Sequence, residues 1–285
     1  MPSFTLTYQS LPERLQHIPQ PPQCLYVASD NWDDLLQRPA VAIVGSRQPT
    51  AYGRSVTRQL AGDLAAQGVV IVSGLAYGVD SLAHEGALAS GGLTLAVLPA
   101  GLASVYPRSH RRLAEQVLSQ GGALVSEYDN ACQQPQRYQF VERNRLIAGF
   151  SRIVIVTEAG LASGSRHTVD FANEQGRDVM AVPGAITNPL SAGPNQHLRD
   201  GAGVVLEYQD VLRALGIGQR PITEHMPGYT AAESNLLNLI YRGVSQQDDL
   251  RRQSRLSIAD FNLALTVLEV VGRIHNVGGN HWSLT

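Results

Sequence analysis

The sequence contains no lysine, and all 22 of its basic residues are arginine. This absence excludes a P-loop, whose lysine must reach the bound phosphates. It also excludes chemistry through a lysine Schiff base. The simplest cause of the bias is codon or compositional preference. Its consequence is that any cationic binding surface in this chain must be built from guanidinium groups.

Cysteine and long apolar runs are also scarce. The two cysteines, Cys24 and Cys132, lie too far apart in sequence to suggest a disulfide framework or a metal-ligand cluster. The best candidate for a membrane span, residues 93–106, is interrupted by Pro99 and Gly101, whereas a span needs about 20 apolar residues. No basic segment followed by an apolar core marks a signal peptide. We therefore expect a cytoplasmic protein with no membrane contact, no metal site and no cofactor.

Size and charge narrow the class further. The chain has 285 residues, of which 44% are hydrophobic and 16% charged, as in a globular protein. This length favours one large domain and a smaller one. The formal net charge of −2 gives no general attraction to nucleic acid. Binding to nucleic acid would therefore require a local cluster of arginines.

From residue 41 onward, short apolar runs alternate with amphipathic stretches. The runs are rich in β-branched residues and lack a period of two, which is typical of strands buried on both faces of a parallel sheet. Repetition of strand and helix in this way predicts an α/β fold with a doubly wound, mostly parallel, Rossmann-like sheet over residues 41–216. Residues 1–40 are rich in proline and predict an irregular lead-in packed on this domain, with a short strand at 25–27. The predicted strands are 41–44, 69–72, 93–98, 123–125, 153–156 and 179–182, and the predicted helices are 52–67, 79–90, 109–119, 142–150, 165–176 and 195–200.

The character of the sequence changes near residue 216. Residues 217–229 contain glycine and proline at intervals and predict a linker. Residues 230–285 then predict three helices, near 231–241, 246–253 and 257–271, followed by two extended segments, 273–277 and 281–284. Three helices and a β-hairpin are the pattern of a small winged-helix domain.

Ligands of doubly wound sheets bind outside the carboxyl ends of the strands. After the first predicted strand comes Gly45-Ser46-Arg47, which lacks the G-x-G-x-x-G spacing of a dinucleotide site. It does provide a small residue, a hydroxyl and a guanidinium near a helix start, all of which can bind anions. A plain capped turn is the alternative.

The loop after the second predicted strand contains Gly74 and Gly78, which permit close approach of a ligand or a positive φ. Asp80 is well placed to cap the next helix. His84, four residues later, could form an acid–base pair with Asp80. We favour the capping role, because no activated nucleophile accompanies the pair.

Two later loops also carry polar residues. Arg108, Arg111 and Arg112 could form a solvated helix face or extend a basic surface toward Arg47. Glu158 follows the fifth predicted strand and could act as a general acid or base, although a structural hydrogen bond to a loop amide is the simpler interpretation. The small residues Ser163, Gly164 and Ser165 precede a helix and suit a phosphate-binding loop.

The segment YQFVERNRLIAGFSR, residues 138–152, places Phe140 shortly before Arg143, Asn144 and Arg145. Alone, it is an ordinary charged helix start. If it lies beside Gly45-Ser46-Arg47, its arginines could converge on the phosphates of one nucleic-acid strand, with Phe140 as a stacking residue.

The order of these segments resembles the DNA-processing protein A (DprA/Smf) family. The resemblance rests on VAIVGSR at 41–47, SGLAYGVDSLAHEGAL at 73–88, AVLPAGLASVYP at 96–107, RNRLIAG at 143–149, and the segments around Glu158, Ser163, Val182 and Gly193. It covers about residues 10–285. Val141, His110 and Arg166-His167 depart from the family pattern, and we do not expect the small helical domain that many members carry in front.

The resemblance implies an extended Rossmann-like domain that binds and protects single-stranded DNA without catalysis. It further implies loading of the RecA recombinase onto that DNA during natural transformation, and homodimers formed through this domain. The implied DNA contacts are Gly45, Ser46, Arg47, Gly74, Phe140, Arg143, Arg145, Ser163, Gly164 and Ser165. Single-strand binders combine a cationic groove with flat groups on which bases stack, and arginine serves both purposes.

Two other functions stay open at this point. One is a nucleotide or nucleoside-monophosphate hydrolase on a related fold with Glu158 as the acting carboxylate, although EAGLASGS lacks the PGG-x-GT-x-x-E order of such enzymes. The other is a double-strand-specific regulator acting through the winged helix. Residues 230–285 hold five arginines and five acidic residues, and the third predicted helix has no basic residue. This surface offers little to phosphates, so we favour a protein-contact or auxiliary role for it.

Overall fold

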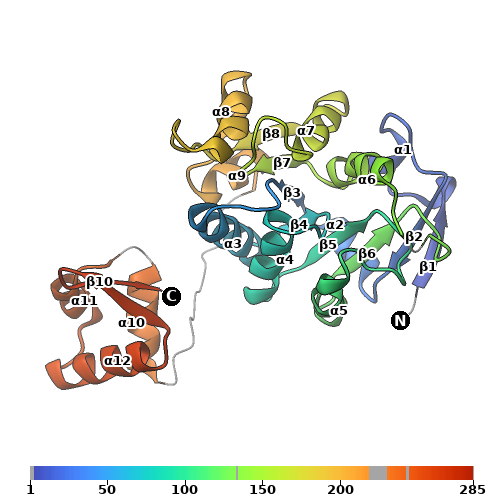
Figure 1. Cartoon of the computed structure of the whole chain (residues 1–285). Coiled ribbons are helices and arrows are strands. Elements are labelled where there is room, and N and C mark those ends of the chain that lie inside the picture. Colours follow the sequence, from blue (N-terminus) through green and yellow to red (C-terminus); the bar gives the residue numbers. More distant parts are fainter. Residues whose placement is uncertain (1–2, 133, 218–229, 242–243, 285) are drawn as a thin grey trace. The chain divides into compact units, whose positions relative to one another are not determined.

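The computed structural model describes residues 3–132, 134–217, 230–241 and 244–284 (Figure 1). The chain divides into two compact units, Met1–Arg220 and Pro221–Thr285, here called the main unit and the C-terminal unit. Apart from Ile217, the predicted linker lies outside the described residues, as does Arg242. Within the described residues, no helix combines the length and apolar character that crossing a bilayer would require.

The main unit is built on one nine-stranded sheet. The strands lie in the order β1-β2-β6-β5-β4-β3-β7-β8-β9. All neighbours from β6 to β9 are parallel, whereas β1–β2 and β2–β6 are antiparallel. The predicted doubly wound, mostly parallel fold is confirmed. The strands are β1 Ser3–Thr7, β2 Cys24–Ala28, β3 Ala40–Val44, β4 Val70–Ser73, β5 Thr94–Leu98, β6 Ala123–Ser126, β7 Ile153–Val156, β8 Asp178–Ala181 and β9 Gly203–Val204.

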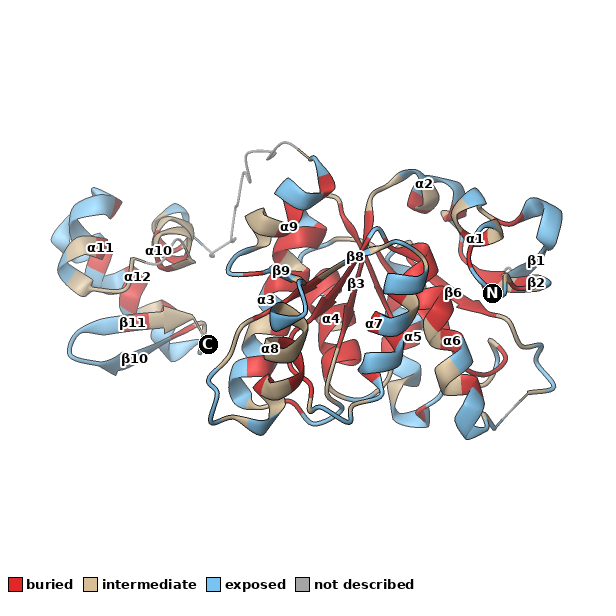
Figure 2. Ribbon diagram, turned by 90° about the horizontal axis from the view of Figure 1, so that it is seen from above, coloured by how far each residue is buried: buried red, intermediate tan, exposed pale blue. Residues whose placement is uncertain are grey.

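Helices cover both faces of the sheet, and the buried residues concentrate in the strands between them (Figure 2). One face packs against α1 Glu13–Gln16, α2 Trp32–Gln37, α6 Arg137–Phe150 and α7 Ser165–Glu174. The other packs against α3 Ala51–Ala66, α4 Val79–Ala89, α5 Arg111–Ser119 and α9 Tyr208–Leu215. Strands β3 to β7 are apolar at almost every position because both faces are buried. Helix α8, Ala192–Arg199, follows β8, and the 3₁₀ turns are η1 Tyr8–Ser10, η2 Arg108–His110 and η3 Pro189–Ser191.

The lead-in is more ordered than the sequence indicates. Strand β2 is found where a short strand is predicted, but β1 was not anticipated and pairs with it in register from Ser3↔Ala28 to Thr7↔Cys24. Trp32 of α2 lies edge-on to both Phe4 and Phe150, with ring centroids 6.2 and 6.1 Å apart. The lead-in therefore extends the sheet and contributes to its core.

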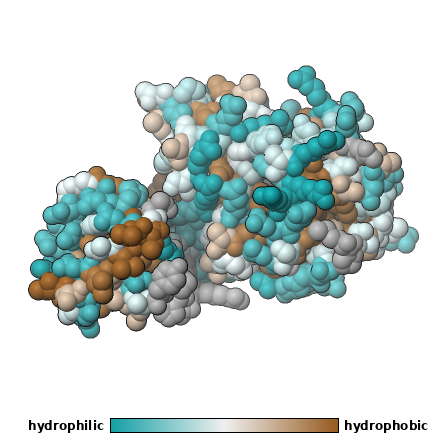
Figure 3. Space-filling model, turned by 60° about the horizontal axis from the view of Figure 1, so that its bottom comes forward, coloured by the Kyte–Doolittle hydropathy of each residue, from teal (hydrophilic) through white to brown (hydrophobic). Residues whose placement is uncertain are grey.

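The C-terminal unit contains α10 Ala231–Tyr241, α11 Gln247–Ser254 and α12 Ile258–Val270, followed by the hairpin strands β10 Ile274–Gly278 and β11 His281–Leu284. This is the predicted order of elements. Phe261, Leu265 and Leu268 of α12 pack into its core. The outer side of α12 is apolar as well: Ile258 is 66%, Leu263 67% and Val270 80% exposed. Figure 3 shows apolar side chains gathered on this unit.

Candidate nucleic-acid interface

The strand order reverses beside β3, whose neighbours are β4 on one side and β7 on the other. In doubly wound folds, such a reversal opens a crevice at the carboxyl ends of the strands. The loop after β3 carries Gly45 to Thr50, and the loop after β7 carries Glu158. Six of the ten predicted site residues lie in these two loops or in the loop after β4.

Glu158 joins the two loops of the crevice. Its carboxylate accepts hydrogen bonds from the Thr50 amide at 2.8 Å, the Thr50 hydroxyl at 2.7 Å and the Asn188 side chain at 3.1 Å. Its backbone oxygen accepts from the Ser46 amide at 2.6 Å. The residue is 1% exposed. A carboxylate with this many donors holds the loops in place and has no free oxygen directed at a substrate, so the structural interpretation of Glu158 is the one that its geometry supports.

The loop after β3 turns closely against its neighbours. A Cβ on Gly45 would collide with the backbone oxygen of Glu158, and a Cβ on Gly78 would collide with Ser46 and Arg47. Gly78 also has φ of +78°, a region that favours glycine. These close approaches fix the backbone of the loop, and Arg47 itself is exposed.

Arg47 contacts one aromatic ring at the surface, and a second ring packs against the first. Its guanidinium carbon lies 5.7 Å from the centroid of the Phe140 ring, within cation–π range. The Phe140 ring in turn meets Tyr106 edge-on at 5.3 Å between centroids. Among the described residues, Arg47 has no carboxylate partner and no side-chain hydrogen bond. The cluster of Arg47, Phe140 and Tyr106 is thus an exposed cation over one flat ring, which packs edge-on against a second.

Phe140 reaches this cluster because α6 begins earlier than predicted, at Arg137 instead of residue 142. Gln136 and Gln139 form a reciprocal capping box that starts the helix there. Phe140, Arg143 and Asn144 then lie at i, i+3 and i+4, so all three project from one face of α6. Each of them contacts a different loop at the carboxyl edge of the sheet.

Arg143 is buried, with 4% of its surface exposed. Its Nη1 donates to the carbonyl oxygens of Gly74, at 2.7 Å, and of Val97. A Cβ on Gly74 would lie 2.5 Å from the guanidinium, so only glycine leaves room for it. Burial lowers the pKa of Arg143 to about 10, while nearby Asp80 favours its charged form. Arg143 therefore ties α6 to the loop after β4 and to strand β5. Direct contact with DNA by this residue stays a prediction.

Asp80 lies inside the first turn of α4 and does not cap it, since the N-cap is Gly78. Its Oδ2 accepts from the Gly74 amide at 3.1 Å. Burial raises the pKa of Asp80, and the charge of Arg143 opposes that rise. The predicted capping role is wrong. Asp80 accepts from the amide of Gly74, whereas Arg143 donates to the carbonyl of the same residue, so both side chains hold the loop after β4.

His84 does not pair with Asp80. Its Nδ1 lies 2.6 Å from the Thr94 hydroxyl, which itself donates to the Ile71 carbonyl. The hydroxyl must therefore accept from Nδ1–H, and Nε2 is left buried with no hydrogen-bond partner among the described residues. Burial lowers the pKa of His84 to about 3, so the ring is neutral. This geometry is that of a core histidine.

Arg145 points away from the cluster. Its Nη2 lies 2.6 Å from Glu127, its Nε donates to the Gln20 carbonyl, and its side chain is 8% exposed. The expectation that Arg145 converges with Arg47 is not met, because residues two apart on a helix face opposite sides. Arg145 fastens α6 to the lead-in and to the loop after β6.

The residues Ser163, Gly164 and Ser165 lie beside Asn144, whose amide donates to the Gly164 carbonyl at 3.4 Å. The hydroxyls of Ser163 and Ser165 lie 2.9 Å apart. No heavy atom lies within 4 Å of a Cβ built on Gly164, so this glycine is not required by packing. The structure thus brings nine of the ten predicted residues to one edge of the sheet, around α6. The tenth, Arg145, is directed toward Glu127 and Gln20 instead.

Two aromatic residues that the sequence analysis did not assign to the site belong to this edge. Tyr106 joins the Arg47 cluster, and Tyr77 is 50% exposed with its ring edge-on to His110 at 4.9 Å. The Tyr77 hydroxyl lies 3.0 Å from the Ser109 hydroxyl. Both tyrosines follow strands that end at this edge, and that position was the signal available in the sequence.

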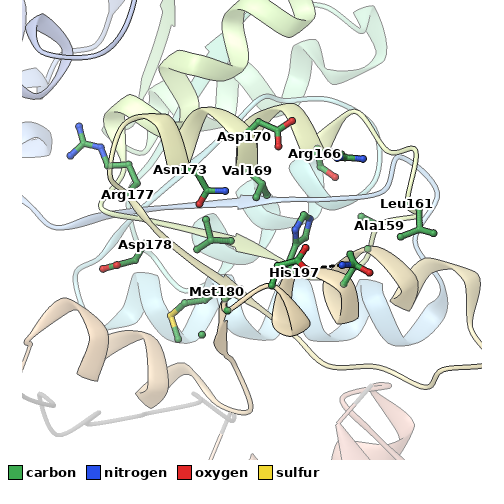
Figure 4. Close-up of a pocket in the computed structure, with 18 of the residues that line it drawn as sticks. Ala159, Leu161, Arg166, Val169, Asp170, Asn173, Arg177, Asp178, Met180 and His197 are labelled. Carbon is green, nitrogen blue, oxygen red and sulfur yellow. Dashed lines mark hydrogen bonds between the residues drawn. The ribbon is translucent and has the colours of Figure 1, made fainter.

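A hollow of about 870 Å³ lies between α7 and α8, at the β9 end of the sheet (Figure 4). Val169 and Asn173 of α7 point toward His197 of α8. Burial lowers the pKa of His197, which favours its neutral form. The charged side chains of its lining are two arginines and three aspartates: Arg166, Arg177, Asp170, Asp178 and Asp200. An anionic lining does not suit a polyanion, so size alone does not make this hollow the DNA site.

Comparison with known proteins gives a consistent picture. Residues 3–216 match the profile of a family described as DNA recombination-mediator protein A. Protein Smf of Escherichia coli is 47% identical over 178 residues, which are 62% of this chain and 47% of that protein. DNA processing protein DprA of Streptococcus pneumoniae is 42% identical over 211 residues, 74% of this chain and 73% of that one. A putative DprA of Mycobacterium tuberculosis is matched over 61% of its length. The chain therefore spans about half of the Escherichia coli protein and about three fifths of the Mycobacterium tuberculosis protein.

Two solved structures resemble the main fold. The X-ray structure of DprA from Streptococcus pneumoniae has a TM-score of 0.69 at 40% identity and covers 74% of this chain and 73% of that one. A structure of DNA processing protein A from Helicobacter pylori has a TM-score of 0.67 at 33% identity and covers 75% of this chain and 95% of that one. The latter is described as showing a unique single-stranded DNA binding mode.

Proposed function

The chain belongs to the DNA recombination-mediator protein A family, and on this premise we propose that it binds single-stranded DNA and does not act as an enzyme. The observation that carries the proposal is the surface cluster of Arg47, Phe140 and Tyr106. The cation of Arg47 is exposed and unneutralised among the described residues, and it lies on the face of an aromatic ring. The Helicobacter relative, with its single-stranded DNA binding mode, has the same fold at 33% identity.

The chemistry of the cluster suits a single strand better than a duplex. A guanidinium binds phosphate through parallel hydrogen bonds, and an aromatic ring accepts an unstacked base, which is worth about 1–3 kcal/mol per base. In a duplex the bases are stacked on one another, so only the phosphates would be available to this cluster. We therefore propose that Arg47 holds the strand backbone and that Phe140 and Tyr106 face its bases.

The buried polar residues around the cluster have a positioning role in this proposal. Arg143 fixes the loop of Gly74, Glu158 fixes the loop of Ser46, and Asn144 meets Gly164. Loops held in this way present Ser46 and Ser163 as further hydrogen-bonding groups along the strand, whereas Ser165 is buried and its hydroxyl lies against that of Ser163. No acid–base or nucleophilic role is assigned, since Glu158 and His84 are both engaged in the core.

We further propose that the bound strand is protected and handed to the RecA recombinase during natural transformation. The description of the family as a recombination mediator supports this step. We also propose a homodimer formed through the main unit. In support, the edge strand β9 exposes 48% of Val204, and Leu206 just after it is 78% exposed.

For the C-terminal unit we propose a protein-contact or auxiliary role. The outer side of α12 exposes Ile258, Leu263 and Val270 together with Asp260 and Glu269, and it carries no arginine. An apolar and acidic surface does not attract phosphates. Double-stranded DNA is therefore a poor partner for this helix.

A salt titration of DNA binding tests the proposal. Fluorescence anisotropy with a labelled oligothymidylate should show binding whose logarithm falls linearly with the logarithm of salt concentration, by about 0.7 per phosphate engaged. The same protein should bind a duplex of equal length much more weakly. Equal affinity for both forms, or no binding to the single strand, would reject the proposal. Release of free base from nucleoside monophosphates would show instead that the protein is an enzyme.

A further inference from the structure

A smaller hollow, whose charged lining residues are mainly cations, adjoins the Arg47 cluster. It measures about 480 Å³ and lies between α3 and α4. Its lining includes Arg47, Arg54 and Arg58, the ring of Tyr77, and one carboxylate, that of Glu85. Three guanidiniums against one carboxylate give it an excess of positive charge, in contrast to the larger hollow between α7 and α8.

Close packing of the two helices creates this arrangement. Gly86 of α4 lies against the backbone of Arg58, whose Cα is 3.0 Å from the place that a Cβ would occupy. A larger residue would push the helices apart. Because they cross so closely, the exposed face of α3 with Arg54 and Arg58 borders the start of α4. These two arginines are one helical turn apart, about 6 Å along the axis.

The arginines of the hollow are available to a ligand. Arg54 is exposed and, among the described residues, has no ion pair and no side-chain hydrogen bond. Arg58 bonds Glu85 at 2.8 Å, but the two side chains are 52% and 43% exposed. An exposed pair of this kind contributes little to stability, because both charges stay solvated. A phosphate can therefore replace Glu85 as the partner of Arg58 at little cost.

Tyr77 supplies a flat surface at the mouth of the hollow. Its ring is half exposed yet held from two sides, by the edge-on contact with His110 and by the hydroxyl contact with Ser109. A ring held in this way loses little conformational entropy when a base stacks on it. The combination of spaced cations and a fixed ring is that of a single-strand binding surface.

We propose that the DNA strand does not end at the Arg47 cluster but continues into the groove between α3 and α4. Arg47 lines both places and joins them. Arg54 and Arg58 bind the phosphates of the next nucleotides, and Tyr77 stacks on a base. This proposal rests on the proposed function, because it extends the same strand along the surface.

The test compares strand lengths. Wild-type protein and the double variant Arg54→Ala/Arg58→Ala are titrated with labelled oligothymidylates of about four and about twelve nucleotides, near the limits of known site sizes. The variant should bind the long strand about tenfold more weakly, and its salt slope should fall by about 1.4, or 0.7 for each of two phosphates. Its affinity for the short strand should stay within about twofold of wild type.

Arg38→Ala/Arg152→Ala is the matched control. It removes the same charge just before β3 and β7, at the amino edge of the sheet. It should leave both affinities unchanged. Equal weakening by the two double variants would mean that net charge alone is responsible and would overturn the inference.

Glu85→Gln provides a test in the opposite direction. It frees Arg58 and removes the one carboxylate of the groove, so binding of the long strand should strengthen by about threefold. Asp34→Asn, which breaks the exposed Arg38–Asp34 pair, is its matched control and should change nothing.

The outcomes separate the two proposals. If wild type binds both strands and Arg54→Ala/Arg58→Ala matches it in affinity and slope, the groove is not used, while the proposed function stands. If the variant loses the short strand equally, the arginines belong to one compact site and the continuation is wrong. If wild type binds neither strand, the proposed function fails and the inference fails with it.

Discussion

The loop after β3 and the first turns of α6 both bring arginines to the carboxyl edge of the sheet, but they use them in opposite ways. Arg47 stands on a loop whose backbone packs closely at Gly45 and Gly78, and it is exposed. Arg143 and Arg145 stand on a helix that packs on the sheet, and both are buried. Under the proposed function, an arginine of the site either binds the DNA, as Arg47 would, or holds the loops that bind it, as Arg143 would.

The contrast predicts separable effects of substitution. An exposed cation contributes to binding and little to stability, whereas a buried one contributes to stability first. Measuring unfolding and DNA affinity on the same variants therefore distinguishes the two roles.

The largest effect on stability is expected from Arg143→Ala. It leaves Asp80 buried without its cation and removes the donor to the Gly74 and Val97 carbonyls. We expect the free energy of unfolding to fall by about 3–5 kcal/mol, as measured by urea denaturation of the main transition. Arg137→Ala, an exposed arginine of the same helix, is the control and should change it by less than about 0.5 kcal/mol. A loss below about 1 kcal/mol for Arg143→Ala would show that this residue is not a structural anchor.

Arg145→Ala should have the next largest effect. It breaks the ion pair with Glu127, which is 21% exposed and so is partly solvated when left alone. We expect a loss of about 2–3 kcal/mol with little change in affinity for single-stranded DNA. A large loss of affinity in a variant that folds normally would restore Arg145 to the binding surface, contrary to the orientation described above.

A pH effect is expected from His84. The pKa is about 3 in the folded protein against 6.5 for a free histidine, so the unfolded chain binds a proton between these values and the folded one does not. Stability from this group is complete above pH 6.5 and is lost as the pH falls. Between pH 7 and pH 5 the loss should be about 2 kcal/mol.

The variant His84→Gln isolates this effect, because glutamine does not titrate and can still donate to Thr94. The difference in pH dependence between wild type and the variant cancels the contribution of Asp80, whose raised pKa acts in the opposite direction. Equal slopes in the two proteins would mean that His84 is protonated in the core or in contact with solvent.

Much of the fold is readable from the sequence. The β-branched apolar runs mark the six central strands to within about two residues, since strands buried on both faces need apolar side chains at every position. Strand β1 was missed because Ser3–Thr7 has the alternating pattern of an edge strand and stands beside a proline-rich stretch. Its pairing with β2 is a tertiary contact that local sequence does not encode.

The sequence predicts which loops form the site better than it predicts the directions in which the side chains point. The rule that ligands bind at the carboxyl ends of strands identifies the loops of Gly45, Gly74 and Ser163. The early start of α6 was missed, and with it the fact that Arg143 and Arg145 diverge. Burial of Arg143 depends on the space left by Gly74, which lies 69 residues away in the chain and is brought close only by folding.

We propose above all that the exposed guanidinium of Arg47 binds the phosphate backbone of the DNA strand. The direct test is to measure Arg47→Ala in both assays, with Arg38→Ala as control. We expect a free energy of unfolding within about 0.5 kcal/mol of wild type, and affinity for a short oligothymidylate at least about tenfold lower, since a phosphate contact and the cation beside Phe140 are lost together. Unchanged affinity for the single strand in a normally folded Arg47→Ala protein would contradict the account.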